Sequence, residues 1–256
     1  MQAMQPIYET DVLLQQYLLF HYGTAEDQLP FPFGPRDALF YPVRCVTAFA
    51  PFFAERPARA LDLGCAVGRS TFELARYAGE VVGIDLSQSF IHAAQSMQRN
   101  GEIGFARLEE GAVSTPVRRS LPAGIDRRRC RFQTGDATVY DPVLGTFDVV
   151  LAANLLDRVQ SPRTLLQNCV RYLKPGGTLI LASPYTWLAD FTPADAWLGG
   201  RLDAQGQRVD TLAHLQSLLE PGCELLHTAD LPFLIREHAR KYQWSVAQAT
   251  VWRRNA

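Results

Sequence analysis

The sequence predicts an α/β domain built around a mostly parallel β-sheet. Apolar, strand-like runs alternate with helix-like segments from residue 58 to residue 184, which is the pattern of a parallel sheet with helical crossovers. The first run, ARALDLG (58–64), ends in glycine and leads directly into a helix-like segment. A last run, QWSVAQATVWRR (243–254), alternates with the period of two that marks a strand. At 256 residues, the chain is long enough to bury a full core.

The elements follow in a regular order. Strands are predicted at 58–64, 80–87, 129–137, 146–156, 178–184, 223–233 and 243–254. Helices are predicted at 68–78, 89–100, 161–173 and 210–220. Ser161 is a suitable N-cap for the third helix and Pro162 its first residue, while KPGG (174–177) is expected to end it.

Two long inserts interrupt this order, at 101–128 and 184–209. Inserts of this length in a compact domain usually act as lids or binding elements. Before the first strand, residues 7–56 are predicted to be mostly helical. We therefore expect a helical N-terminal cap or lid over 1–56 and a single compact main domain over 57–256.

Composition and charge exclude several classes of function. The formal net charge is −1, without runs of like charge, so we expect no nucleic-acid partner. Apolar runs are too short to cross a bilayer, and MQAMQPIYETD (1–11) lacks the pattern of a signal peptide, so a cytoplasmic protein without a membrane partner is expected. The five cysteines are scattered, with no C-x-x-C pair and no histidine at ligand spacing, which argues against disulfides and a metal site.

The turn LDLGCAVGRS (61–70) carries the first functional motif. It lacks the lysine of a phosphate-binding P-loop and the G-x-G-x-x-G of a dinucleotide fingerprint. The remaining pattern, D-x-G-x-x-x-G, resembles motif I of class I S-adenosylmethionine-dependent methyltransferases, with Ala66 in place of the usual middle glycine. A plain tight turn is the alternative.

The surrounding sequence supports the methyltransferase interpretation. Asp85 ends the second strand, 21 residues after Gly64, where a carboxylate can accept hydrogen bonds from a ribose diol. The family places its adenine-reading group at the position of GDA (135–137), and KPGG is common before its fifth strand. Asp62 would lie near the methionine amine of the cofactor, or serve as a turn carboxylate that caps nearby amides. The resemblance implies S-adenosylmethionine as cofactor, S-adenosylhomocysteine as product, no metal, and a cofactor site made of Asp62, Gly64, Cys65, Gly68, Asp85, Leu86, Gly135, Asp136, Ala137 and Asn154.

The acceptor is expected at the loops after the fourth, fifth and sixth strands, because ligands of open α/β sheets bind beyond the carboxyl ends of parallel strands. In this superfamily the seventh strand is antiparallel, which puts the turn LIREHARKY (234–242) on that edge. An arginine for a carboxylate, an amide or acid for an amine, and an aromatic wall suit an amino-acid acceptor. The predicted substrate-binding residues are Tyr17, His21, Arg44, Asn154, Tyr185, Trp187, Arg236, Glu237 and Lys241.

Plainer roles compete with several of these assignments. Glu237 and Lys241 are spaced for a surface ion pair, and Trp187 could fill the core. His238 is expected to be a surface or hinge histidine more often than a base. Tyr17 and His21, with Tyr8, could fold over the cofactor as a lid, or simply lie on an amphipathic helix that packs on the domain.

A narrower resemblance covers nearly the whole chain, from about residue 8 to residue 254. The segments GIDLSQSFI, LAANLLDR, SPYTWLADFTP and PFLIREHARKYQW are similar to the methyltransferase of ovothiol biosynthesis, usually the C-terminal domain of a fusion with an iron-dependent sulfoxide synthase. The resemblance implies a Rossmann-like, seven-stranded sheet and methyl transfer to the imidazole π nitrogen of 5-thiohistidine, the last step to ovothiol A. This chain contains no synthase part, so a functional link to a separate sulfoxide synthase is expected.

Methyl transfer to an imidazole nitrogen requires alignment and the correct tautomer rather than a metal. A hydrogen bond to the other ring nitrogen would hold that tautomer, and Asn154, Tyr185 or Glu237 is the expected donor or acceptor. Arg236 or Arg44 is expected to bind the amino-acid carboxylate. Two alternatives remain: methylation of another small amino-acid or thiol acceptor, and a non-catalytic partner of a sulfoxide synthase that binds S-adenosylmethionine.

Overall fold

The computed structural model describes residues 7–256, with side chains from residue 8 onward. The N-terminal part contains the short 3-10 helices η1 (Ile7–Glu9), η2 (Arg36–Ala38) and η3 (Ala50–Phe52) and the helices α1 (Asp11–Tyr22), α2 (Ala25–Gln28) and α3 (Tyr41–Thr47). The remaining helices are α4 (Arg69–Leu74), α5 (Gln88–Asn100), η4 (Arg127–Arg129), η5 (Pro142–Leu144), η6 (Leu156–Arg158), α6 (Pro162–Tyr172), η7 (Ala194–Ala196) and α7 (Thr211–Leu219). The strands are β1 (Arg59–Leu63), β2 (Glu80–Asp85), β3 (Glu102–Glu110), β4 (Val113–Ser120), β5 (Cys130–Thr134), β6 (Phe147–Ala153), β7 (Leu173–Ser183), β8 (Arg201–Leu202), β9 (Arg208–Val209), β10 (Cys223–His238) and β11 (Lys241–Arg254).

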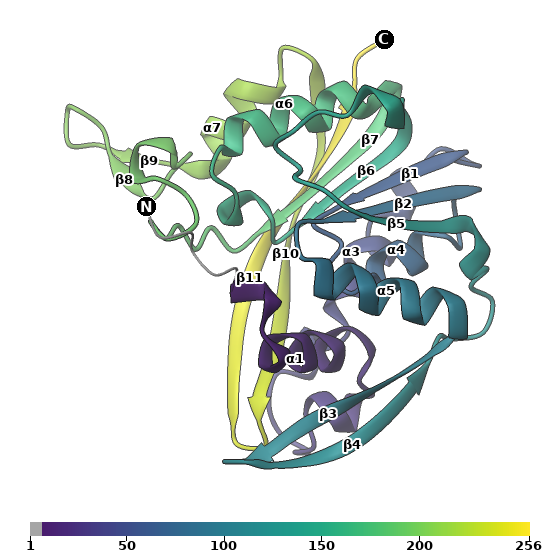
Figure 1. The fold of residues 1–256 in the computed structure, drawn as a ribbon. Coiled ribbons are helices and arrows are strands. Elements are labelled where there is room, and N and C mark those ends of the chain that lie inside the picture. The colour runs from purple at the N-terminus through teal and green to yellow at the C-terminus, as the bar shows by residue number, and fades with distance from the viewer. Residues whose placement is uncertain (1–6) are drawn as a thin grey trace.

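Seven strands form the central sheet in the order β10-β11-β7-β6-β1-β2-β5 (Figure 1). The pairs from β5 to β7 are parallel, whereas β11 runs antiparallel to both β7 and β10. The predicted fold, a Rossmann-like and mostly parallel seven-stranded sheet with an antiparallel last strand and N-terminal helices, is therefore confirmed. The carboxyl ends of β1, β2, β5 and β6 meet at one edge, where ligands of such sheets bind.

Side chains alternate between two hydrophobic clusters, one on each face of the sheet. On one face, residues such as Ala60, Val149 and Ile180 pack with α1, α3, α4 and α5. On the other face, neighbours such as Leu61 and Val150 pack with α6 and α7. This alternation follows from the period of two in a strand, and it explains why the parallel strands read as continuous apolar runs.

The N-terminal helices share the first of these clusters. Leu18, Phe20 and Tyr41 belong to the same buried cluster as the sheet residues Ala60 and Val149. The N-terminal cap is thus packed onto the sheet through a common core. The division of the chain into a cap over 1–56 and a main domain over 57–256 stays a prediction.

Four features differ from the predicted elements. The helix expected over 68–78 ends at Leu74, and β7 begins at Leu173, with an irregular register against β6 across KPGG. The insert 101–128 forms the hairpin β3–β4, which extends beneath α1 in Figure 1. The pair β10–β11 is longer than expected and reaches far past the end of β7, because only residues 248–253 of β11 pair with β7.

No helix within residues 7–256 has the length and apolar character needed to span a membrane.

Candidate active site at the carboxyl edge of the sheet

A cavity of about 350 Å³ lies at the carboxyl ends of β1, β2, β5 and β6, under the N-terminal segment. Its size is in the range of small-molecule and cofactor sites. The predicted cofactor residues Asp62, Gly64, Cys65, Asp85, Leu86, Gly135, Asp136, Ala137 and Asn154 all line it. Gly68 does not line the cavity, but it starts α4 behind the glycine turn.

The glycine turn has the conformation that its sequence requires. Gly68 has φ +90°, and a Cβ there would lie only 2.8 Å from a ring carbon of Phe132. Ala66, at the position where the family has glycine, also has a positive φ of 47°. Its amide donates a 2.9 Å hydrogen bond to the Asp85 carboxylate, which holds the strained residue in place. The departure from the family pattern thus keeps the left-handed geometry at a cost of about 1–2 kcal/mol.

Asp85 is fixed between two elements at the end of β2. One carboxylate oxygen accepts the Ala66 amide and the other accepts the Ser87 amide, each at 2.9 Å. Burial raises the pKa of Asp85, and these two amide hydrogen bonds oppose the shift. Each oxygen keeps a lone pair, so the carboxylate can also accept two hydroxyl groups, as a ribose diol would require.

Asp62 lies deeper, at the end of β1. Its side chain is buried and accepts a 2.7 Å hydrogen bond from the Thr71 hydroxyl. Burial raises the pKa of Asp62 to about 7, the Thr71 hydrogen bond lowers it, and the charge of Asp85 raises it further. A cationic amine next to this carboxyl group would restore its ionised form.

The N-terminal segment closes the outer side of the cavity. The Glu9 carboxylate accepts the amides of Gln88 and Ser89 at 2.8 and 3.2 Å, at the N-terminus of α5. This contact places the ring of Tyr8 between Phe90 and Phe191, at centroid distances of 5.9 and 6.2 Å. The predicted lid residues therefore line the cavity, and their movement stays a prediction.

His21 and Tyr17 form part of the same wall. The Tyr17 and His21 rings stack at 6.0 Å, and both residues line the cavity. His21 Nδ1 accepts the Arg69 amide at 3.4 Å, which assigns the ring hydrogen to Nε2. Burial lowers the pKa of His21 to about 3, with a further contribution from Arg69. This histidine is therefore neutral near pH 7 and is a poor proton acceptor.

Asn154 lies directly after β6 and lines the cavity. It follows β6 with a positive φ of 51°, and its amide donates to the Ala182 carbonyl oxygen at 2.7 Å. The hydroxyl of Tyr41 donates to Asn154 Oδ1, also at 2.7 Å. The residue is held at its backbone amide and at Oδ1, which leaves Nδ2 and one lone pair of Oδ1 for a ligand.

Other predicted substrate residues lie elsewhere. Tyr185 has a positive φ of 54°, but its hydroxyl donates to Gln248 on β11, and it does not line the cavity. Trp187 is buried in the second core cluster and donates toward Thr211, which agrees with the core-filling alternative. Arg44 donates to the carbonyl oxygens of Leu39 and Pro232, and so connects α3 with β10.

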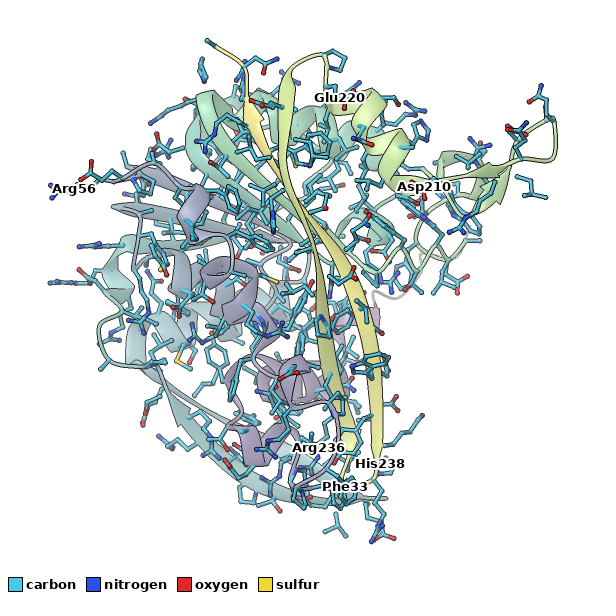
Figure 2. All side chains as sticks on the ribbon, turned by 180° about the vertical axis from the view of Figure 1, so that it is seen from behind. Phe33, Arg56, Asp210, Glu220, Arg236 and His238 are labelled. Atoms are coloured by element: carbon cyan, nitrogen blue, oxygen red, sulfur yellow. The ribbon has the colours of Figure 1, made fainter. Side chains whose placement is uncertain are left out.

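The hairpin turn that joins β10 to β11 does not reach the cavity, which corrects the predictions for Arg236, Glu237 and Lys241. The Arg236 guanidinium donates to the Asp27 carbonyl oxygen and forms a 2.5 Å ion pair with Glu109. Glu237 pairs with Lys241 at 2.7 Å, as in the surface alternative. Figure 2 shows Arg236 and His238 near the end of the long hairpin, beside Phe33.

Strand alternation explains the position of Arg236. The neighbour of Arg236, Ile235, lines the cavity, and residues next to each other in a strand point to opposite faces. The sequence indicates the edge of the sheet at which the hairpin lies, but it does not show to which face each side chain points.

Several lining residues are not among the predicted site residues. They include Asp190 and Phe191 from the insert 184–209, and Arg158, which the sequence places among the hydrogen-bonding groups of the loop after the fourth strand. Arg158 had a detectable signal, because it is a charged residue in the loop that follows an apolar strand. Asp190 and Phe191 had none, since the path of a long insert is set by tertiary contacts.

Residues 61–181 match the model of a family described as a methyltransferase domain. This segment belongs to the class I S-adenosylmethionine-dependent methyltransferases. A curated relative, the ubiquinone biosynthesis O-methyltransferase of Methylococcus capsulatus, is 27% identical over 125 residues, which are 49% of this chain and 43% of the relative. The chain thus spans less than half the length of this relative.

Solved structures of methyltransferases share the fold. The N-methyltransferase NodS of Bradyrhizobium japonicum, in complex with S-adenosylhomocysteine, aligns with a TM-score of 0.52 and 16% identity over 95% of this chain and 99% of that one. A [4+2]-cyclase, SpnF, aligns with a TM-score of 0.54 and 19% identity over 84% of this chain and 82% of that one. Because the fold also carries a cyclase, the site rather than the fold must indicate the reaction.

The residues of the methyltransferase domain fit the cofactor. Asp85 would hold the ribose hydroxyls, Asp136 and Ala137 would border the adenine, and the Gly64 turn with Asp62 would face the methionine end. Leu86 lies at the rim of the cavity with 69% of its surface exposed, where an apolar side chain can cover a base. Across residues 7–256 we find no group of three or more acidic, histidine or cysteine residues placed to hold a metal ion.

Proposed function

We propose that this protein transfers the methyl group of S-adenosylmethionine to the imidazole π nitrogen of 5-thiohistidine, which gives ovothiol A. One observation carries the proposal: besides the predicted cofactor residues, the cavity is lined by Asn154, by Arg158 and by the aromatic residues Tyr8, Tyr17 and Phe191. A small, polar, aromatic amino-acid acceptor needs such a set. The similarity of nearly the whole chain to the ovothiol methyltransferases gives further support.

The chemistry asks for alignment more than for acid–base catalysis. The cofactor supplies a sulfonium-bound methyl group; the nitrogen–carbon bond forms as the sulfur–carbon bond breaks. With the acceptor thiol ionised, the product is an imidazolium–thiolate, so the ring proton can stay in place. This agrees with a cavity whose histidine, His21, is held neutral by burial.

Asn154 is the residue best placed to select the tautomer. Of the three candidates from the sequence, it alone lines the cavity; Tyr185 and Glu237 are engaged elsewhere. The free lone pair of Asn154 Oδ1 can accept the N–H of the τ nitrogen, which leaves the π lone pair for attack. We assign Asn154 this role, with Tyr41 as the residue that positions it.

We also propose a functional link to a sulfoxide synthase, which would form the carbon–sulfur bond of the acceptor.

A turnover assay tests the proposal. The protein is mixed with S-adenosylmethionine and 5-thiohistidine, with histidine and an unrelated small thiol as parallel acceptors, and products are followed by mass spectrometry with fragmentation. One methyl group on the π nitrogen of 5-thiohistidine is expected, with little on the other acceptors. Methylation of sulfur, a preference for another acceptor, or cofactor binding without turnover would refute the proposal.

A further inference from the structure

Arg158 is held in one orientation on the acceptor side of the cavity. Its Nη1 donates to the carbonyl oxygen and carboxylate of Asp157 at 3.0 and 3.1 Å, and to the Thr186 carbonyl oxygen at 3.0 Å. The guanidinium carbon lies 4.8 Å from the centre of the Phe191 ring. An arginine fixed on one nitrogen and against one ring loses little side-chain entropy when it binds a ligand.

The anchor of Arg158 is itself rigid. Asp157 is fully buried and also accepts the Ser183 hydroxyl at 3.0 Å and the Thr186 amide at 2.9 Å. It therefore joins the loop after β6 to the loop after β7. These partners hold both oxygens of the Asp157 carboxylate, which contacts Arg158 through a single nitrogen, Nη1.

The opposite edge of the guanidinium is available. Within residues 7–256, Nε and Nη2 of Arg158 have no hydrogen-bond partner, and the side chain is 24% exposed. The hydrogens of Nε and Nη2 lie on the same edge of the guanidinium plane, in the side-on geometry that binds a carboxylate through both oxygens.

Within residues 7–256, the charged residues that line the cavity are four aspartates and one arginine. Asp62, Asp85 and Asp136 lie at the ends of β1, β2 and β5, whereas Asp190 comes from the insert 184–209, next to Phe191. Arg158 is the one arginine or lysine among the described residues that line the cavity. The Arg158 guanidinium faces the aromatic wall, because its central carbon lies 4.8 Å from the centre of the Phe191 ring, which itself lies 6.2 Å from the centre of the Tyr8 ring.

We propose that Arg158 is a carboxylate-binding site that selects amino-acid acceptors and fixes their orientation against the cofactor. The inference rests on the proposed methyl transfer and deepens it. Arg158 takes the carboxylate-binding role that the sequence suggested for Arg236 or Arg44. The guanidinium groups of those two residues donate instead to backbone carbonyl oxygens. A carboxylate in this cavity could also come from the methionine part of the cofactor, so the test must separate these two sources.

The test compares Arg158→Met and Arg158→Lys with the wild type and with Arg131→Met. Arg131 is a suitable control because its side chain is 78% exposed and it lies on β5, outside the cavity. For each protein, S-adenosylhomocysteine affinity is measured by calorimetry, and KM and kcat are measured for 5-thiohistidine and for its decarboxylated analogue, 5-thiohistamine.

We expect the wild type to prefer 5-thiohistidine by about 100-fold in kcat/KM, the size of a lost bidentate charged contact. Arg158→Met should remove this preference by raising KM for 5-thiohistidine alone, with cofactor affinity within about threefold of the wild type. Arg158→Lys keeps the positive charge but loses the bidentate geometry of the guanidinium. Its preference for 5-thiohistidine should therefore lie between those of the wild type and Arg158→Met. Arg131→Met should behave as the wild type.

Two results would overturn the inference. A parallel loss of S-adenosylhomocysteine affinity would place the cofactor's own carboxylate on Arg158. An equal loss of activity with both acceptors would make Arg158 a structural residue of the loop.

The inference can also be separated from the proposed function. If the wild type does not methylate 5-thiohistidine, the S-adenosylhomocysteine-loaded protein is titrated with L-histidine and histamine. Binding of L-histidine that is lost with histamine, or when Arg158 is replaced, would support the carboxylate site. The absence of such binding would reject the site.

Discussion

The two halves of the cavity are built in different ways. In the cofactor half, Asp85 ends β2 and Asp62 is the penultimate residue of β1. Their carboxylates are held by Ala66 in the glycine turn and by Thr71 in α4, respectively. In the acceptor half, Phe191 comes from a long insert and Tyr8 from the N-terminal segment, and they meet only in the folded protein. Local strand-end chemistry thus defines the cofactor site, and tertiary assembly defines the acceptor site.

The largest expected effect belongs to the cofactor half. Asp85→Ala should weaken S-adenosylhomocysteine binding by about 300-fold, because it removes a charged acceptor for the ribose and also releases the strained Ala66 turn. Calorimetry measures the affinity, and circular dichroism checks the fold. A change below about tenfold would mean that the ribose is bound elsewhere.

Arg236→Met should separate the hairpin from the active site. Removing this guanidinium leaves the Asp27 carbonyl oxygen without its partner and takes one of two arginines, Arg236 and Arg107, from Glu109, so the free energy of unfolding should fall by about 2 kcal/mol. KM for the acceptor, measured on the folded fraction at low temperature, should stay unchanged. A raised acceptor KM with normal stability would return Arg236 to the substrate site.

Asn154→Gly should affect the chemical step. Glycine accepts the positive φ at this position, so the variant removes the amide without backbone strain. We expect kcat to fall by about 30-fold, the value of a lost orienting hydrogen bond, with cofactor affinity nearly retained. Tyr41→Phe, which leaves Asn154 Oδ1 without its partner, should have a smaller effect of the same kind. An unchanged kcat in both variants would remove Asn154 from the proposed mechanism.

Cofactor affinity should depend on pH through Asp62. Because burial raises the pKa of this carboxyl group to about 7, it is protonated below that pH and ionised above it. A cofactor amine prefers the ionised form, so affinity should fall by up to about tenfold per pH unit as pH decreases from 7 to 5.5. Asp62→Asn should bind more weakly at pH 7.5 and show a flat profile over this range. The same slope in both proteins would assign the titration to another group.

The smallest effect is expected at the end of the hairpin. Lys241→Met removes a surface ion pair with Glu237, in which the lysine side chain is 63% exposed. Stability should change by less than about 0.5 kcal/mol, and turnover should be unaffected. A specific rise in acceptor KM would contradict the assignment of this turn as structural.

The same comparison shows what the sequence could predict. The glycine turn and Asp85 were predictable because strand ends are visible as apolar runs, and parallel strands bring their ends to one edge. Arg236 was misplaced because the sequence does not give the length of β10–β11 or the side of the strand on which each residue lies. Phe191 was not predictable, since its position depends on how the insert 184–209 packs against the N-terminal segment.

The division of the cavity into two halves can be tested most directly by a crystal structure with S-adenosylhomocysteine and 5-thiohistidine bound together. The account predicts the adenosyl group at Asp85, the imidazole ring beside Asn154 and the acceptor carboxylate on Arg158. An acceptor bound at the hairpin turn near Arg236, or a cofactor carboxylate on Arg158, would contradict it.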